Sequence, residues 1–255
     1  MVFTSGLPSF AAVREGAGEM VELYICKLPI RKEESDLNKL LVHVSTERQN
    51  RVKRFVKLDD AYRSLIGDLL VRFVLKERYG SVKEELGWMT NSFGKPFLSN
   101  YPSFHYNISH SGEFVVCAVH DEEVGVDIEK IGTFELQLAK GFFTEEEYKQ
   151  VLKAEDGLSS FYDIWTLKES YIKAKGKGLS IPLHSFNVRR HGMEDIQLTD
   201  VHSDMPITDF TCRQYEVDCE YRLAVCAYKV SAESFKDHHR SVTFHQICEG
   251  LKYHP

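Results

Sequence analysis

Five stretches of the chain combine alternating or continuous apolar positions with β-branched and aromatic residues, a pattern typical of β-strands. They cover residues 21–27, 105–109, 114–120, 124–129 and 222–230. All five are short, as strands in globular proteins usually are. The pattern therefore predicts small sheets built from short strands.

Two other segments place apolar residues at the three- and four-residue spacing of an amphipathic helix. The first covers residues 59–79 and is followed by Gly80, a residue that favours a helix C-terminus. The second covers about residues 160–175 and ends at Gly176. Their apolar faces consist of Tyr62, Leu65, Ile66, Leu69, Leu70 and Phe73 in the first, and of Phe161, Ile164, Trp165, Leu167, Tyr171 and Ile172 in the second.

The sequence contains a weak internal repeat, in which short segments of the first part match segments a little over 100 residues later. A shift of 109 residues aligns VCA at 116–118 with VCA at 225–227, and it aligns Leu58, Asp60 and Tyr62 with Leu167, Glu169 and Tyr171. A shift of 103 residues aligns Val21, Ile25 and Lys27 with Val124, Ile128 and Lys130. We therefore expect an α/β (α+β) fold of two pseudo-twofold-related halves, each a small sheet packed with a long helix. The active site is expected in the cleft between them.

Domain boundaries follow from these elements. The N-terminal α/β half is expected to cover residues 20–123 and the C-terminal α/β half residues 124–255. Residues 1–19 precede Met20, which stands directly before the first predicted strand, so we expect a flexible extension or an over-long translation start. The segment lacks a charged n-region and a sustained apolar stretch, which argues against a signal peptide.

Composition excludes several classes of protein. With 32 basic and 38 acidic side chains, the 255-residue chain has a formal net charge of −6, so bulk charge does not favour nucleic-acid binding. Its longest apolar runs, at 114–119 and 223–228, fall far short of the roughly 20 residues that span a membrane. Six cysteines without a C-x-x-C pair are typical of reduced thiols, so we expect a cytoplasmic protein.

Candidate chemistry begins with the carboxylates of the predicted strand VGVDIEK. Strand alternation places Asp127 and Glu129 on one face. Such a pair is usually an ordinary solvated strand face, but it also suits Mg²⁺, which prefers hard oxygen ligands. Glu169 on the second predicted helix offers a third carboxylate, with Lys173 four residues later on the same helix face. Alone, that spacing is typical of a surface ion pair.

Basic residues gather in two places where they could bind a polyphosphate or merely form a solvated face. The first group surrounds the end of the second predicted helix and consists of Lys168, Lys173, Lys175 and Lys177. The second group precedes the first predicted helix and consists of Arg48, Arg51, Lys53, Arg54 and Lys57. The three-residue spacing of 48, 51 and 54 aligns guanidinium groups that can bind phosphates bidentately.

The stretch HYNISHSG runs from a predicted strand into a turn and exposes Ser109, His110 and Ser111. A serine hydrolase would pair one of these serines with a histidine and Asp127, but the chain lacks the G-x-S-x-G elbow. The chain also lacks a P-loop and a G-x-G-x-x-G, so an ordinary nucleotide site is not expected. A phosphate contact is the favoured role for His110.

The combination GKPF, FHYNISHSG, GVDIEK, FFTEEEY and WTLKESYIKAKGKGL, in that order, resembles the surfactin-type (Sfp-type) 4′-phosphopantetheinyl transferases. RVKRF, DAYRSLIGDLLVR and a final AVCA strand extend the resemblance over about residues 20–251. It implies a monomer with coenzyme A and Mg²⁺ (or Mn²⁺) in the cleft between its halves. It also implies transfer of 4′-phosphopantetheine to a serine hydroxyl of an apo carrier protein of a peptide synthetase, polyketide synthase or fatty acid synthase, with release of 3′,5′-ADP.

The resemblance also assigns roles to individual residues. It makes Asp127, Glu129 and Glu169 the metal ligands, with Glu169 also the expected base and Lys173 the contact to the pyrophosphate. The coenzyme A contacts it implies are Arg48, Arg51, Ser64, Lys95, Ser109, His110 and Lys173. The family often has lysine at positions 48 and 51 and threonine at 64, so charge and hydroxyl are kept. The carrier is expected to dock at residues 133–143, whose apolar residues Phe134, Leu136, Leu138, Phe142 and Phe143 could equally be core.

Two other functions share part of this pattern. A Mg²⁺-dependent phosphohydrolase of coenzyme A or nucleotides would use the same carboxylates without a protein acceptor. A coenzyme A-binding or scaffold protein would need no group of three carboxylates, so Asp127, Glu129 and Glu169 argue against it. We therefore favour the transferase.

Overall fold

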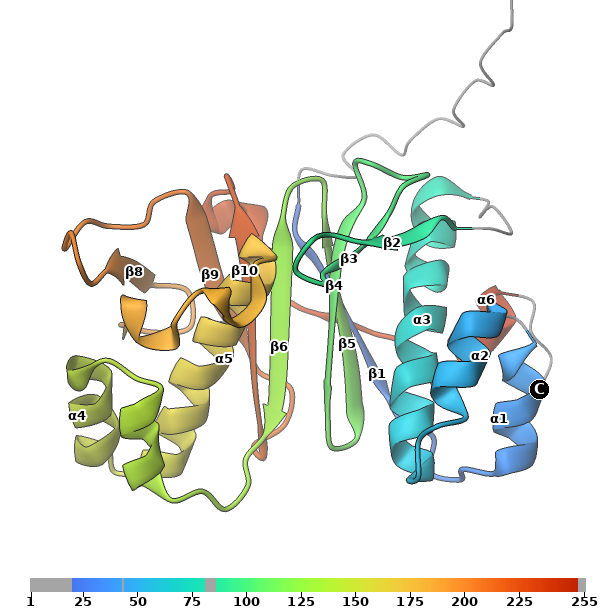
Figure 1. Ribbon diagram of the computed structural model, residues 1–255, viewed down its shortest axis with the longest axis horizontal. Helices are drawn as coiled ribbons and strands as arrows, with labels where there is room; N and C mark the ends of the chain where they lie inside the picture. The colour runs from blue at the N-terminus through green and yellow to red at the C-terminus, as the bar shows by residue number, and fades with distance from the viewer. Residues whose placement is uncertain (1–19, 43, 81–85, 252–255) are drawn as a thin grey trace, which may run out of the picture.

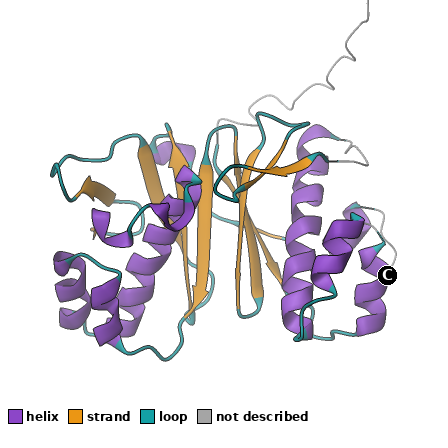
Figure 2. Cartoon of the chain, in the orientation of Figure 1, coloured by secondary structure: helices purple, strands orange, loops and turns teal. Residues whose placement is uncertain are grey.

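The structure is a computed structural model that describes residues 20–42, 44–80 and 86–251, so the expected extension at 1–19 lies outside the described residues. Two sheets lie face to face at its centre, and helices cover the outer face of each (Figure 1). The result is four layers in the order helices, sheet, sheet, helices, as the colouring by secondary structure makes plain (Figure 2).

The N-terminal half is built on a four-stranded sheet ordered β11-β1-β5-β4. Its strands are β1 (Glu22–Lys27), β4 (His105–Ser111) and β5 (Phe114–His120), joined by β11 (Arg240–Ser241) from the end of the chain. Its helices are α1 (Glu34–Leu41), α2 (Thr46–Val52) and α3 (Leu58–Tyr79), and a separate hairpin consists of β2 (Trp88–Thr90) and β3 (Pro96–Leu98). The predicted helix at 59–79 is therefore confirmed as α3.

The C-terminal half is built on a three-stranded sheet ordered β6-β10-β9, consisting of β6 (Val124–Lys130), β9 (Phe210–Tyr215) and β10 (Tyr221–Tyr228). Its other elements are the helices α4 (Glu145–Lys153) and α5 (Gly157–Lys175), the hairpin β7 (Phe186–Arg190) and β8 (Ile196–Asp200), and the short 3-10 helices η1 (Leu136–Gly141), η2 (Gly178–Ser180), η3 (Leu183–Ser185) and η4 (Ala232–Ser234). α5 begins at the capping residue Asp156 and ends at Gly176, whose φ of 63° is left-handed. The second predicted helix is therefore confirmed as α5.

The two sheets share one topology, which confirms the predicted pseudo-twofold relation. In each, the first strand of the half pairs antiparallel with the last, giving β1-β5-β4 in one half and β6-β10-β9 in the other. The sequence shifts align β1 with β6, β5 with β10 and α3 with α5. Tyr24 lies opposite Cys117 in the first sheet, so the two shifts predict that Asp127 lies opposite Cys226 in the second. In the structure Asp127 lies opposite Ala224 instead, two residues away. A slip of two residues keeps each side chain on its face, so strands and faces are equivalent.

The end of the chain crosses back to the N-terminal half, although the predicted C-terminal half included it. We call residues 231–251 the C-terminal strap. β11 pairs in parallel with β1, and the helix α6 (Phe244–Gly250) lies beside the N-terminal helices (Figure 1). Val242, Ile247 and Cys248 are buried in the N-terminal core, because that core offers the apolar surface that α6 covers. The division into 20–123 and 124–255 remains a prediction.

Apolar side chains fill the space between the two sheets. β1 and β5 contribute Leu23 and Val116 to this layer, and β6 and β10 contribute Val126 and Val225 from the opposite side. All four side chains are buried, so this layer fixes how the halves face each other. No helix in the described part of the chain is long and apolar enough to cross a membrane.

Candidate active site

β6 presents its two carboxylates, Asp127 and Glu129, toward α5 rather than toward the other sheet. Val126 and Ile128, the alternate residues, fill the layer between the sheets. Gly125 lets the helix come close, since a Cβ there would lie 2.1 Å from the carbonyl oxygen of Ser170 on α5. The carboxylates are therefore held between a strand and a tightly packed helix.

Asp127 is almost fully buried, with 2% of its surface exposed. Its Oδ1 accepts hydrogen bonds from Lys173 Nζ at 2.5 Å and from the Ser109 hydroxyl at 3.0 Å. Its Oδ2 is buried and has no hydrogen-bond partner among the residues that the structure describes. Burial raises the pKa of Asp127, while the positive charge of Lys173 opposes that shift. An unpartnered carboxylate oxygen in such a place suits a cation.

Glu129 and Glu169 lie in the same electrostatic environment. Burial, and then the negative charge of Asp127, raise the pKa of Glu129 to about 7. The same two causes, in the same order, raise the pKa of Glu169. The negative charge of Asp127 thus acts on both glutamates, and a divalent cation among the three carboxylates would relieve this repulsion.

As the side chains stand, the described residues contain no three His, Cys, Asp or Glu close enough together to hold a metal ion. The positive charge next to Asp127 is instead the ammonium group of Lys173 on α5, which forms an ion pair with this carboxylate. The sequence placed Lys173 near the predicted metal site, and the structure brings it there together with Ser109, whose hydroxyl also accepts a hydrogen bond from Lys173 Nζ at 3.2 Å.

α5 is locked in place by a buried ion pair next to Glu169. Lys168 Nζ lies 2.8 Å from Glu147 Oε1, and both side chains are 0% exposed. Lys168 also donates to the carbonyl oxygens of Leu183 and Phe186, at 2.8 and 2.6 Å. The sequence grouped Lys168 with lysines available to a polyphosphate; that grouping is wrong, because the side chain points into the protein. The lock instead fixes the orientation of the helix that carries Glu169.

His110 and Ser64 belong to the N-terminal half, and of the two His110 lies close enough to Asp127 for its charge to act on that carboxylate. His110 is exposed, and partial desolvation followed by the positive charges of Arg63 and Lys173 lowers its pKa. Ser64, on α3, is half-buried. Arg63, which the sequence did not single out, donates to the Gly112 carbonyl oxygen and to Asp60. The sequence could have indicated this ion pair, because Arg63 follows Asp60 by three residues on the predicted helix.

Arg48 and Arg51 differ in how far they are already engaged. Two nitrogens of Arg48 donate to the buried carboxylate of Asp68 on α3. Arg51, one helical turn later on α2, is exposed. Arg51 is therefore the freer of the two expected phosphate contacts, and Arg48 primarily joins α2 to α3.

Lys95 joins the β2–β3 hairpin to the C-terminal half. Its Nζ donates to the carbonyl oxygens of Ala174 at 2.9 Å and of Val124 at 3.1 Å. Burial lowers its pKa to about 8. Two of its three N–H groups are thus committed to the ends of α5 and β6, which leaves one for the expected coenzyme A contact.

The expected carrier-docking segment divides into buried and exposed residues. Phe143 is buried, while Phe134 and Leu136 are partly buried and pack against the same small core beside α4 and α5. Leu138 and Phe142 are 56% and 39% exposed. Only these two remain available for an apolar contact with a partner.

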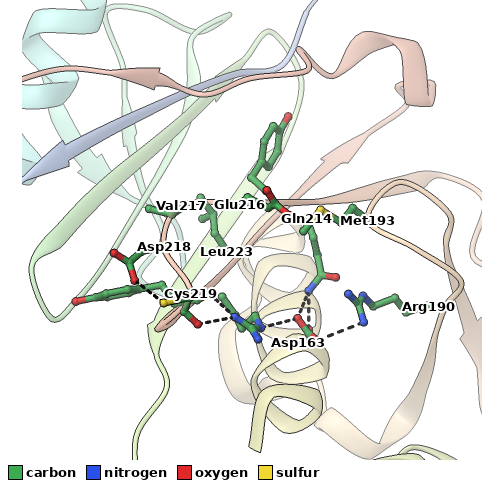
Figure 3. Close-up of a pocket in the computed structure, with 12 residues that line it drawn as sticks. Asp163, Arg190, Met193, Gln214, Glu216, Val217, Asp218, Cys219 and Leu223 are labelled. Carbon is green, nitrogen blue, oxygen red and sulfur yellow. Dashed lines mark hydrogen bonds and ion pairs between the residues drawn. The ribbon is translucent and has the colours of Figure 1, made fainter. Parts of the chain in front are cut away.

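A hollow of about 470 Å³ lies away from the carboxylates, at the edge formed by β9 and β10 (Figure 3). Asp163 of α5 lies at its centre, paired with Arg190 at 3.2 Å and with Arg222 at 3.1 Å. Gln214 also donates to Asp163, at 3.1 Å. These contacts to Asp163 join α5 to β7, β9 and β10.

Comparison with known proteins decides the family. A family model described as "4'-phosphopantetheinyl transferase superfamily" matches residues 123–226, and one described as "4'-phosphopantetheinyl transferase, N-terminal" matches residues 31–122. The "4'-phosphopantetheinyl transferase Sfp" of Bacillus subtilis (strain 168) is 41% identical over 203 residues, which cover 78% of this chain and 88% of that protein. The chain belongs to the Sfp-type 4′-phosphopantetheinyl transferases. The fold and enzyme class expected from the sequence are therefore confirmed.

Other phosphopantetheinyl transferases are similar to different extents. The "4'-phosphopantetheinyl transferase gsp" of Aneurinibacillus migulanus is 37% identical over 82% of this chain and 86% of its own. The "L-aminoadipate-semialdehyde dehydrogenase-phosphopantetheinyl transferase" of Mus musculus is 34% identical over 55% of this chain and 50% of its own. A solved holo-[acyl-carrier-protein] synthase of Thermotoga maritima matches 43% of this chain and 64% of its own, at 16% identity and a TM-score of 0.35.

Proposed function

We propose that this phosphopantetheinyl transferase performs its reaction at the junction of β4, β6 and α5, with Asp127, Glu129 and Glu169 as ligands of a Mg²⁺ ion. The observation that carries the proposal is the unpartnered, buried Oδ2 of Asp127, whose carboxylate lies close enough to Glu129 and Glu169 to raise the pKa of both. Family membership supplies the substrates, which are coenzyme A and an apo carrier protein.

The donor set fits Mg²⁺ and not a softer metal. All three side chains offer carboxylate oxygens, with no Cys or His among them, and hard oxygen donors are what Mg²⁺ and Mn²⁺ prefer. When bound, the ion would neutralise negative charge on the pyrophosphate of coenzyme A. Release of Asp127 from Lys173 would free the Lys173 ammonium, on the same helix face as Glu169, to bind a phosphate oxygen.

The transfer needs a base that accepts the proton of the carrier serine, and it needs that serine hydroxyl to be held next to the phosphorus it attacks. The carrier serine oxygen forms a bond to the β-phosphorus of coenzyme A, the bond from that phosphorus to the bridging oxygen breaks, and 3′,5′-ADP leaves with the electron pair. Glu169 accepts the serine proton, since its raised pKa makes it a better base than an ordinary glutamate. Lys173 stabilises charge on the leaving group.

The remaining contacts to coenzyme A come from the N-terminal half. Arg51 and His110 are exposed and bind phosphate oxygens, and Ser64 offers a hydroxyl from α3. Arg48 and Lys95 each keep an N–H group beyond those that bind Asp68 or the backbone carbonyls. Lys95 therefore links substrate binding to the packing of the two halves.

The carrier protein docks near Leu138 and Phe142, the exposed apolar residues of the segment that follows β6. The enzyme works as a monomer, as the family resemblance implies, and in the cytoplasm, which six free cysteines, five of them buried, support. Leu138→Asp should raise the KM for the carrier with little change in the KM for coenzyme A. Leu152→Asp, at an exposed residue of α4, is the matched control.

Intact-protein mass spectrometry tests the proposed function. An apo carrier protein incubated with the enzyme, coenzyme A and Mg²⁺ should gain one phosphopantetheine, and EDTA should abolish the gain. Consumption of coenzyme A without a gain in carrier mass would support a phosphohydrolase instead. Binding of coenzyme A without consumption would support a binding protein, and a gain that survives EDTA would refute the metal.

A further inference from the structure

Two edge strands from different sheets lie side by side at the centre of the molecule. β4 is the last strand of the N-terminal sheet, and β6 is the first strand of the C-terminal sheet. The two strands are close neighbours in Figure 1, yet they belong to no common sheet. An edge strand leaves every second backbone N–H without a ladder partner. The backbone groups on the free edge of β6 must therefore be satisfied in another way.

Side chains of β4 replace the missing ladder. Asn107 Oδ1 accepts a hydrogen bond from Val126 N at 2.9 Å. Ser109 Oγ accepts from Ile128 N at 3.4 Å, and Ser111 Oγ accepts from Lys130 N at 3.0 Å. Donor and acceptor residues are always 19 positions apart, so β4 and β6 run parallel in a constant register. We call Asn107, Ser109 and Ser111 the polar seam.

The polar seam interrupts a layer that is otherwise apolar. On β5, the strand next to β4, the residues paired with the seam are Ala118, Val116 and Phe114, and all three pack between the two sheets. Asn107 and Ser109 are buried as well, with 8% of their surface exposed. Burying polar side chains there costs stability unless they form hydrogen bonds, and each seam residue forms one with β6.

The two serines of the seam also reach the carboxylates of the proposed metal site. Ser109 donates its proton to Asp127 Oδ1 at 3.0 Å, and Ser111 donates to Glu129 Oε2 at 2.8 Å. Each hydroxyl therefore accepts from a backbone N–H of β6 and donates to the carboxylate of the preceding residue. The arrangement holds one oxygen of each carboxylate and leaves Asp127 Oδ2 unpartnered.

We propose that the polar seam is a positioning device that joins the two halves through β4 and β6 and, through its serines, orients Asp127 and Glu129. Ser109 is then a positioning residue rather than the coenzyme A contact that the family resemblance implied. Its one proton goes to Asp127, and its two lone pairs accept from Ile128 N and Lys173 Nζ. The joining role stands without any metal, whereas the orienting role rests on the proposed metal site.

Amide hydrogen exchange of the metal-free protein tests the joining role. Ser111→Ala removes the acceptor of the Lys130 amide, so that amide should exchange at least about tenfold faster. Ser111→Thr keeps the hydroxyl and should retain slow exchange. Ser99→Ala, a serine outside the seam that donates to the Gly87 carbonyl oxygen, should leave β6 exchange unchanged. Unchanged exchange of Lys130 in Ser111→Ala would overturn the joining role.

A Mn²⁺ titration followed by electron paramagnetic resonance tests the orienting role, because it measures metal binding without turnover. Ser111→Ala should weaken Mn²⁺ binding about 10-fold to 100-fold, the usual effect of removing a group that orients a metal ligand. Ser111→Thr should restore binding to within about threefold of wild type. Loss of exchange protection with unchanged Mn²⁺ binding would refute the orienting role alone. If Asp127→Ala also binds Mn²⁺ normally, the proposed metal site itself is wrong.

Discussion

The first strands of the two halves, β1 and β6, occupy equivalent places but have their outer edges covered differently. Backbone groups of the C-terminal strap cover β1: Val21 N donates to the Ser234 carbonyl oxygen at 2.7 Å, and Val242 N donates to Ile25 O at 2.8 Å. Side chains of the polar seam cover β6. Because a serine hydroxyl can donate as well as accept, the same side chains that cover the edge of β6 also donate to its carboxylates.

The faces of β1 and β6 that pack against the long helices also differ, and again the polar side chains are on β6. On β1, Tyr24 and Cys26 face α3 within an apolar core. On β6, Asp127 and Glu129 occupy the equivalent face toward α5. One half therefore uses the shared scaffold for stability, and the other uses the same position to hold charge. This difference predicts that equivalent substitutions will damage stability in one place and activity in the other.

Asp127→Ala should have the largest effect on activity. Loss of a proposed metal ligand should lower kcat/KM by about 10³-fold or more, since charge neutralisation by a metal supplies several kcal/mol. The protein should stay folded, because the substitution removes a buried carboxylate and leaves Lys173, which is partly exposed and can be solvated. Tyr24→Phe is the matched change on β1 and should retain activity. Turnover within tenfold of wild type in Asp127→Ala would refute its assignment.

Lys168→Met should have the largest effect on stability. It leaves Glu147 buried without its cation, which costs about 3–5 kcal/mol in free energy of unfolding. The 109-residue shift aligns Lys168 with Asp59 of α3, whose ion pair with Lys32 is half exposed. Asp59→Ala should therefore cost only about 0–1 kcal/mol. Urea unfolding of both variants measures the two changes in free energy of unfolding. Equal changes would show that the ion pairs of α3 and α5 contribute equally to stability.

Glu169→Gln should lower kcat by about 10²–10³-fold while changing the KM for coenzyme A by less, because a base acts in the transition state. The same shift aligns Glu169 with Asp60, which is paired with Arg63 at the surface of α3. Asp60→Asn should change kcat by only a few-fold. Steady-state kinetics with both substrates varied gives the answer. Equal effects of Glu169→Gln on kcat and on coenzyme A affinity would make Glu169 a ligand only.

The pH dependence of stability should be the smallest of these effects. The pKa of Glu129 is about 7 in the folded protein and near 4.5 in the unfolded chain, so the folded state binds more protons between these values. Stability of the metal-free protein should fall as pH rises from about 4.5 to 7. The pKa difference alone corresponds to about 3 kcal/mol, and because Glu129 is only half-buried, solvent screening reduces this to on the order of 1 kcal/mol. Glu129→Gln should flatten this fall in urea unfolding series. Cys26, buried on the equivalent face of β1, has a pKa of about 12 and adds no slope there.

Much of the fold could be predicted from periodicity. The apolar pattern located β1, β5, α3 and α5, and two short matches at fixed spacing indicated the repeated topology. The C-terminal strap could not be assigned in this way. A two-residue strand and a seven-residue helix carry too little periodic signal, and their partners, β1 and α3, lie about 200 residues earlier.

The candidate site was predictable in part. Alternation on β6 correctly placed Asp127 and Glu129 on one face, and the structure brings Lys173 and Ser109 to them. Lys168 was misassigned because its partner, Glu147, lies on another helix, and sequence spacing does not show tertiary ion pairs. The polar seam had a visible signal, which was polar residues at every second position of β4. That signal gains meaning only when β6 is known to lie beside it.

A crystal structure with coenzyme A and Mn²⁺, analysed by anomalous scattering, would test the central claim that β6 and α5 together form the metal site. The account predicts one strong peak at roughly 2.1 Å from carboxylate oxygens of Asp127, Glu129 and Glu169, with the pyrophosphate in contact with the metal. The Ser109 and Ser111 hydroxyls should still donate to the carboxylates of β6. A metal peak away from these side chains, or a pyrophosphate bound without contact to β6 and α5, would contradict the account.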